Sequence, residues 1–90
     1  MKTDIKKSVL RRLKIAAGQI GGLERMVLHD TYCVDIITQS AAVREALSGI
    51  ERLMLQNHLA THVVHQMKSG KSKQAVDEII KIYRFAQKKK

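Results

Sequence analysis

The sequence predicts an all-α protein. Its 90 residues include no proline, and no stretch alternates apolar and polar residues as a half-buried β-strand does. Apolar residues instead recur at steps of three and four, which is the spacing of one face of an α-helix. Only 3% of the residues are aromatic although 44% are hydrophobic, a balance that is typical of aliphatic seams between helices. We expect one domain, residues 1–90, with helices at residues 3–28, 31–67 and 73–87.

The first expected helix has the most regular apolar pattern. Thr3 or Asp4 is a suitable N-cap for it. Gly18, Gly21 and Gly22 fall inside the helix, where each costs about 1 kcal/mol relative to alanine. We therefore expect another helix backbone to approach closely there, or the helix to bend. The apolar seam consists of Ile5, Val9, Leu13, Ala16, Ile20, Leu23 and Val27.

The second expected helix is long and the third is short. Asp30 or Thr31 can cap the second helix, and Gly70 can end it in the left-handed conformation that glycine adopts without strain. Ser72 can then cap the third helix. The inward face of the third helix is expected to consist of Val76, Ile79, Ile80, Tyr83 and Ala86.

The long helix carries the only cysteine and three of the four histidines. At about 100° per residue, Cys33, His58 and His62 fall within roughly 20° of one stripe. At about 1.5 Å rise per residue, however, the thiol and the imidazoles of one straight helix lie roughly 37 Å apart. Two copies of the helix packed antiparallel would place the cysteine of one chain beside both histidines of the other. The stripe therefore predicts a site shared between subunits.

These side chains also have plain structural interpretations. Cys33 falls in the first turn of its helix, where the positive end of the dipole favours a thiolate, but a lone cysteine is more often inert and half-buried. The i, i+4 spacing of His58 and His62 lets two imidazoles bind one metal ion, yet such spacing also occurs by chance. His65 lies near the same stripe. Three roles are open for it: a third imidazole ligand, a neighbour of the ligands, or an exposed side chain.

The size and charge of the chain predict an oligomer that binds a polyanion. A chain this short buries only about 60–65% of its surface, and long helices with little chain to cover them usually bury their seams in an oligomer. The net charge of +9 favours nucleic acid, although an anionic membrane surface has the same electrostatic attraction. Basic side chains are concentrated near the N-terminus, where they form either a solvated face or a phosphate-binding face.

Several protein classes are excluded by what the sequence lacks. A single cysteine rules out an internal disulfide, and no segment has the apolar core of a signal peptide or of a membrane-spanning helix. We therefore expect a cytoplasmic protein with no membrane partner. No glycine-rich phosphate loop, GxSxG or HExxH motif occurs. We expect no enzymatic activity.

Three segments resemble the copper-sensitive operon repressor family, which also includes nickel/cobalt, formaldehyde and persulfide sensors. They are RRLKIAAGQIGGLERM at residues 11–26, DTYCVDIITQSAAVREAL at residues 30–47 and NHLATHVVHQ at residues 57–66, in the order and spacing of the family. The resemblance implies an all-helical dimer of antiparallel long helices, paired into a tetramer. It also implies a transcriptional repressor that binds operator DNA and releases it when its site is loaded.

The resemblance implies a ligand set as well. The family's fingerprint matches Cys33, His58 and His62, with the cysteine and the two histidines contributed by different subunits. In copper-sensing members a tyrosine before the cysteine and a glutamate of the third helix surround the ligands, and Tyr32 and Glu78 match those places. We expect metal to draw His58 into position, so that its other nitrogen engages these neighbours and the helices shift until the basic face no longer fits DNA.

Departures from the family decide which ligand we favour. Many copper sensors have a second cysteine where this chain has His62, and nickel/cobalt sensors combine Cys-His-His with an N-terminal histidine that this sequence lacks. Formaldehyde sensors use an N-terminal proline and persulfide sensors need two cysteines, and the chain has neither feature. One thiolate and two imidazoles suit three-coordinate Cu(I); with the N-terminal amine or water they also suit Ni(II), Co(II) or Zn(II). We favour one Cu(I) ion per intersubunit site.

The DNA-binding face is expected mainly on the first helix. Because the chain lacks a recognisable helix-turn-helix, we expect contacts to phosphates and to the shape of double-stranded operator DNA. Two rival functions are an electrophile or formaldehyde sensor that reacts at Cys33 and a constitutive basic DNA-binding protein; a metal-dependent hydrolase is a third. The candidate DNA-contact residues are Lys6, Lys7, Arg11, Arg12, Lys14, Arg44 and Lys81.

Overall fold

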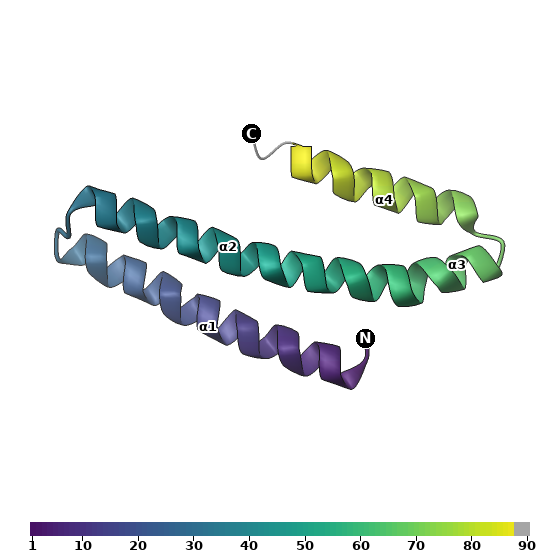
Figure 1. The fold of residues 1–90 in the computed structure, drawn as a ribbon, viewed down its shortest axis with the longest axis horizontal. Helices are drawn as coiled ribbons and strands as arrows, with labels where there is room; N and C mark the ends of the chain where they lie inside the picture. Colours follow the sequence, from purple (N-terminus) through teal and green to yellow (C-terminus); the bar gives the residue numbers. More distant parts are fainter. Residues whose placement is uncertain (88–90) are drawn as a thin grey trace. The chain divides into compact units, whose positions relative to one another are not determined.

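The computed structural model describes residues 1–87, and the predicted all-α class is confirmed for them. No strand occurs within these residues. None of their helices is long and apolar enough to cross a lipid bilayer. In chain order the elements are α1 Thr3–Leu28, α2 Cys33–His58, the π-helical segment η1 Leu59–Val63, α3 Val64–Lys68 and α4 Ser72–Gln87 (Figure 1).

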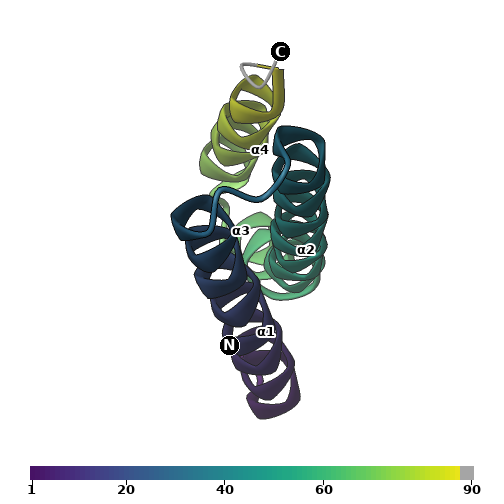
Figure 2. The same cartoon turned by 90° about the vertical axis from the view of Figure 1, so that its left-hand side faces the viewer.

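The chain forms two compact units, Met1–Leu55 and Gln56–Lys90. In the first unit, α1 and α2 run antiparallel and side by side, joined by a short turn (Figures 1 and 2). Its buried apolar side chains are few, because within the unit each helix has the other helix alone to cover it. They are Val9 and Ala16 of α1 and Val43 and Ile50 of α2.

The predicted seam of α1 is therefore covered only in part. Val9 and Ala16 are buried as predicted, whereas Leu13, Ile20 and Val27 are exposed. Within the described residues no other helix backbone approaches the glycines closely, so the expected approach, or a bend of the helix, stays a prediction. A Cβ built at Gly18 meets no atom within 4 Å, and those built at Gly21 and Gly22 meet only the side chain of Arg25.

The turn between α1 and α2 corrects the predicted caps. Asp30 has φ 52°, and the N–H groups of Asp30 and Thr31 donate to the carbonyl oxygens of Val27 and Met26 at 3.1 and 2.9 Å. This bond pair is the left-handed closure of a helix C-terminus, so Asp30 ends α1 instead of capping α2. Aspartate tolerates the left-handed conformation better than most residues other than glycine. The cap predicted for α1 is also wrong, because Lys2 occupies the N-cap and no side chain caps it.

The predicted long helix begins at Cys33 instead of residue 31. The carbonyl oxygen of Tyr32 accepts the first helical bonds, from the N–H groups of Asp35 and Ile36. Helical dihedral angles continue through His58 and Val64 on either side of η1, so α2, η1 and α3 form one helix with a π-helical turn inside it. The helix ends near the predicted residue, at Lys68.

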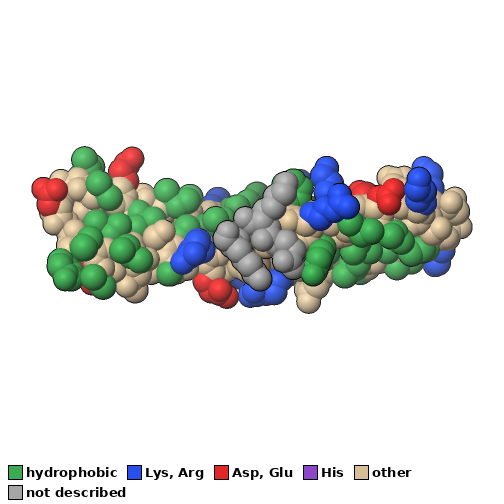
Figure 3. Space-filling model, turned by 90° about the horizontal axis from the view of Figure 1, so that it is seen from above, with side chains coloured by type: hydrophobic (Ala, Val, Ile, Leu, Met, Phe, Trp, Pro, Cys, Tyr) green, Lys and Arg blue, Asp and Glu red, His purple; other side chains and the backbone are tan. Residues whose placement is uncertain are grey.

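The second unit is a hairpin in which α4 packs against η1 and α3. The prediction that Gly70 closes the long helix is confirmed, since Gly70 has φ 77° and the N–H of Lys71 donates to the carbonyl oxygen of Gln66 at 2.7 Å. Among residues 56–86 the buried side chains are Ala75 and the polar Asn57 and Gln66. The predicted inward face of α4 is exposed instead: Val76, Ile79, Ile80, Tyr83 and Ala86. Figure 3 shows hydrophobic side chains on the surface over α4.

Candidate functional site

His58 and His62 form a stacked pair in the second unit. Their ring centroids lie 5.4 Å apart and their planes are inclined by 24°. His58 is the last residue of α2 and His62 lies inside η1, so the pair spans the π-helical turn. Each residue of a π turn rotates about the helix axis by a smaller angle than a residue of an α turn. After four residues the side chain therefore points closer to its starting direction. The π turn thus places both imidazoles on one side of the helix.

One side-chain hydrogen bond and two buried polar atoms lie next to this pair. The hydroxyl of Thr61 donates to the carbonyl oxygen of Asn57 at 2.6 Å, a bond that competes with the regular helical ladder. Nε2 of His58 and Oδ1 of Asn57 are buried, and neither has a hydrogen-bond partner among residues 1–87. A buried polar atom without a partner is uncommon in native proteins and is often associated with function.

Cys33 belongs to the first unit. It is the first residue of α2, it is exposed, and its thiol is free. Cys33 is therefore not half-buried in this chain, and whether its thiol reacts or binds metal stays a prediction. Within residues 1–87, no three histidine, cysteine, aspartate or glutamate side chains gather into a group that could hold a metal ion. One chain supplies the predicted ligands in two separate parts, the thiol in one unit and the imidazoles in the other.

The remaining predicted neighbours lie in three different elements. Tyr32 is exposed in the turn before α2, and His65 is exposed on α3. Glu78 is half-buried on α4, where its Oε1 accepts a hydrogen bond of 2.6 Å from Nε2 of Gln66. Sequence reasoning missed Gln66. Its place four residues after His62 and eight after His58 could have identified it, because such residues share one helix face.

The predicted DNA-contact residues are all exposed. Arg11 and Arg12 line a shallow hollow of about 260 Å³ together with Ile15 and Ala46. The Arg12 guanidinium reaches across to α2, where a Cβ built at Gly49 would lie 3.2 Å from its Nη1. The predicted residues are distributed as Lys6, Lys7, Arg11, Arg12 and Lys14 on α1, Arg44 on α2 and Lys81 on α4.

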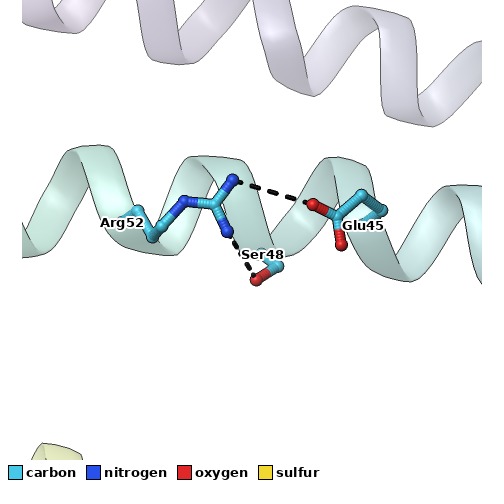
Figure 4. A network of polar contacts seen from close by, with 3 residues as sticks. All are labelled: Glu45, Ser48 and Arg52. Carbon is cyan, nitrogen blue, oxygen red and sulfur yellow. Dashed lines mark hydrogen bonds and ion pairs between the residues drawn. The ribbon is translucent and has the colours of Figure 1, made fainter.

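Arg52 of α2 is a cation of this unit that sequence reasoning did not select. Its Nη2 lies 3.7 Å from Oε1 of Glu45, and its Nη1 donates to Oγ of Ser48 at 3.3 Å (Figure 4). The same guanidinium lies beside Gly49, 3.8 Å from a Cβ built there. Arg12 and Arg52 thus converge on Gly49 from two helices. The side chains of Arg52 and Glu45 are both exposed, so the ion pair between them is weak.

Residues 5–84 match the sequence profile of metal-sensitive transcriptional repressors. The chain is 41% identical over 83 residues to the copper-sensing transcriptional repressor CsoR of Mycobacterium ulcerans (strain Agy99), an alignment that covers 92% of this chain and 71% of that protein. It is 35% identical over 79 residues to the copper-sensing transcriptional repressor CsoR of Bacillus subtilis (strain 168), covering 88% and 78%.

The fold is similar to that of a solved copper-sensing repressor. The crystal structure of CsoR with Cu(I) from Geobacillus thermodenitrificans NG80-2 matches with a TM-score of 0.88 at 29% sequence identity. The match covers 96% of this chain and 91% of the solved chain. Sequence and fold therefore agree on the same group of proteins.

Proposed function

Because the chain belongs to the metal-sensitive transcriptional repressor family, we propose that it binds operator DNA when metal-free and releases the DNA when it binds Cu(I). The observation that carries the proposal is the stacked pair of His58 and His62 on the π-helical turn, which directs two imidazoles to one side of the helix. The family is one of repressors, so the proposed activity is regulatory rather than enzymatic. A protein with this activity works on DNA in the cytoplasm.

Cu(I) fits the donor set better than the other candidate ions. Cys33 supplies a soft thiolate and the two histidines supply imidazoles, a combination that suits three-coordinate Cu(I). The copper-sensing relatives and the Cu(I)-bound solved relative support the same choice. Ni(II), Co(II) and Zn(II) are the alternatives within this family, since further oxygen or nitrogen ligands would complete their coordination.

The two nitrogens of His58 have different roles in the proposal. Nε2 is buried, so a metal ion would bind through Nδ1. A ligand at Nδ1 leaves the proton on Nε2, which then acts as a hydrogen-bond donor inside the protein. The bound metal would thus supply a change in the hydrogen-bonding character of a buried atom. Through that atom the site would be coupled to the packing of the helices.

A complete site requires a second chain. Cys33 and the histidine pair lie in separate units of one chain, so we propose an antiparallel homodimer in which each site combines the thiolate of one subunit with the imidazoles of its partner. Two dimers would form a tetramer. Exposed apolar side chains supply surface for both contacts, and a partner helix could approach the open side of Gly18. The exposed apolar residues of α2, η1 and α4 include Val34, Ile37, Leu59, Val76, Ile80 and Tyr83.

The basic face would hold operator DNA through its phosphates. The candidate side chains on α1 are exposed, and oligomerisation would multiply a net charge of +9 per chain. Without a recognisable recognition helix, sequence preference would come from the shape and deformability of the DNA.

The experiment is a DNA-release titration of the purified protein under reducing conditions. Cu(I), Ni(II), Co(II), Zn(II) and formaldehyde are added in turn, and DNA binding is followed by fluorescence anisotropy. We expect Cu(I) to release DNA, and Cys33→Ala and His62→Ala to abolish that release while DNA binding persists. His29→Ala is the matched control, because His29 lies in the turn after α1 and outside the candidate site. Failure of every metal to release DNA would refute the proposed function.

Formaldehyde provides the test of the rival function. Release of DNA by formaldehyde alone, lost in Cys33→Ala and retained in His62→Ala, would identify an electrophile sensor. The exposed thiol of Cys33 is the observation that makes this arm necessary. If neither formaldehyde nor any of the metal ions changes DNA binding, the protein is a constitutive DNA-binding protein.

A further inference from the structure

Gln66 and Glu78 join α3 to α4 through a hydrogen bond between their side chains. Nε2 of Gln66 donates to Oε1 of Glu78 at 2.6 Å, and Gln66 is only 8% exposed. A carboxylate only accepts hydrogen bonds, so the amide nitrogen must face it and the amide oxygen must point elsewhere. That oxygen is buried and has no hydrogen-bond partner in the described part of the chain. Gln66 is therefore held in an unfavourable environment by its bond to one carboxylate, which indicates a role beyond filling space.

His58 has the complementary need for an acceptor. Its Nε2 is buried without a partner, and it becomes a donor when Nδ1 binds a metal ion. The acids of the second unit within residues 56–87 are Asp77 and Glu78, of which Asp77 is exposed and Glu78 is half-buried. Since α4 packs against η1, which directly follows His58, we take Glu78 as the better placed of these two carboxylates to serve Nε2. A charged acceptor would also give the stronger bond.

Glu78 cannot hydrogen-bond to Gln66 and His58 at the same time. Gln66 follows His58 by eight residues, which is about 12 Å of helix at the α-helical rise and somewhat less through the π turn. Side chains on a helix lean towards its N-terminus, so the polar ends of both residues are displaced in the same direction and stay about as far apart as their backbones. One carboxylate does not span that distance.

We propose that Gln66 is a positioning residue that holds Glu78 in the metal-free protein, and that this bond must break before Glu78 can accept a hydrogen bond from metal-bound His58. The inference rests on the proposed function, because it assigns Gln66 a part in metal-dependent release of DNA. We call the pair the Gln66–Glu78 latch. The latch opposes metal loading, since opening it leaves the buried amide of Gln66 without its acceptor. It therefore sets the metal concentration at which the protein changes state.

The test is to remove the amide of Gln66 and keep the length of its side chain. Gln66→Met does this at a buried position, and Gln74→Met is the matched control at an exposed position of α4. Cu(I) affinity of the full chain is measured anaerobically against a competing chelator. We expect Gln66→Met to bind Cu(I) about tenfold more tightly than the unmodified protein, the effect of one lost hydrogen bond to a charged group. Gln74→Met should leave the affinity unchanged, and DNA release should shift to lower Cu(I) only in Gln66→Met.

A second measurement uses the unmodified protein and so does not depend on whether a variant folds. The side-chain amide resonance of Gln66 is followed by NMR, with Glu78→Ala as the reference for an open latch. We expect Cu(I) to move the resonance of the unmodified protein towards its position in Glu78→Ala. A resonance that Cu(I) leaves in place would overturn the latch.

The outcomes separate the latch from the proposed function. Equal or weaker Cu(I) affinity in Gln66→Met, with normal DNA release by the unmodified protein, overturns the latch alone and makes Gln66 a structural residue. Failure of the unmodified protein to bind Cu(I) overturns the proposed function and the latch with it. Tighter binding without any release of DNA supports only the opposition of the Gln66–Glu78 bond to metal loading; it refutes the repressor mechanism and the part of the latch in DNA release.

Discussion

Replacing Gly70 by alanine tests backbone strain at a position where steric crowding plays no part. Gly70 has φ 77°, and the N–H of Lys71 closes the turn by donating to the carbonyl oxygen of Gln66 at 2.7 Å. A Cβ built at Gly70 meets no atom of residues 1–87 within 4 Å, so the cost of Gly70→Ala is that of the left-handed backbone alone. That cost is about 1 kcal/mol of unfolding free energy.

The measurement is thermal denaturation of the metal-free protein at fixed protein concentration, because association changes apparent stability. For a chain of this size, about 1 kcal/mol lowers the melting temperature by roughly 4–8 °C. Gly70→Asn is the matched variant and should cost less, since asparagine tolerates the left-handed conformation. An unchanged or higher melting temperature for Gly70→Ala, or an equal loss for both variants, would refute the explanation by backbone strain.

Three further substitutions test the first unit. Gly49→Ala should raise the unfolding free energy by about 0.5–1 kcal/mol, because alanine favours the helix. The group that the new Cβ would meet at 3.2 Å is the guanidinium of Arg12, the flexible end of its side chain. A lower unfolding free energy in chemical denaturation would show that this guanidinium cannot move. Arg12→Ala should weaken operator binding and flatten its salt dependence by about one unit of slope, and an unchanged slope would remove Arg12 from the interface. Glu45→Gln should change stability by less than about 0.5 kcal/mol, since its ion pair with Arg52 is exposed, and a loss above about 1 kcal/mol would contradict that view.

The helices could be predicted more reliably than the residues that begin and end them. Apolar spacing located α1 and the long helix to within about two residues, because each residue of a regular seam supports the same period. The caps were wrong at Thr3 and at Asp30. Asp30 illustrates the reason: a short polar side chain can cap the next helix or accept the left-handed backbone that closes the preceding one, and only the path of the chain selects between these roles.

In the candidate site, too, some features could be predicted from the sequence and others could not. Spacing identified Cys33, His58 and His62 as residues of one stripe, and the resemblance assigned them as ligands; their role in binding metal stays a prediction. The π turn that stacks the two histidines could not be predicted. No residue type in η1, Leu59–Val63, favours the i→i+5 hydrogen bonds of a π-helix over the i→i+4 bonds of an α-helix. Gln66 was missed because a glutamine on a helix is ordinarily exposed.

The sequence by itself determined that the chain is helical, that it is strongly basic, and that its cysteine and histidines fall at a spacing one helix cannot bring together. These properties follow from local periodicity and composition, which do not depend on how the helices pack. Only the tertiary structure decided which apolar residues are covered, how the histidine pair is oriented and which amide holds Glu78. Those features depend on contacts between residues far apart in the chain and on small changes of helical pitch. The energies involved are too small and too dependent on neighbours to be read from residue order.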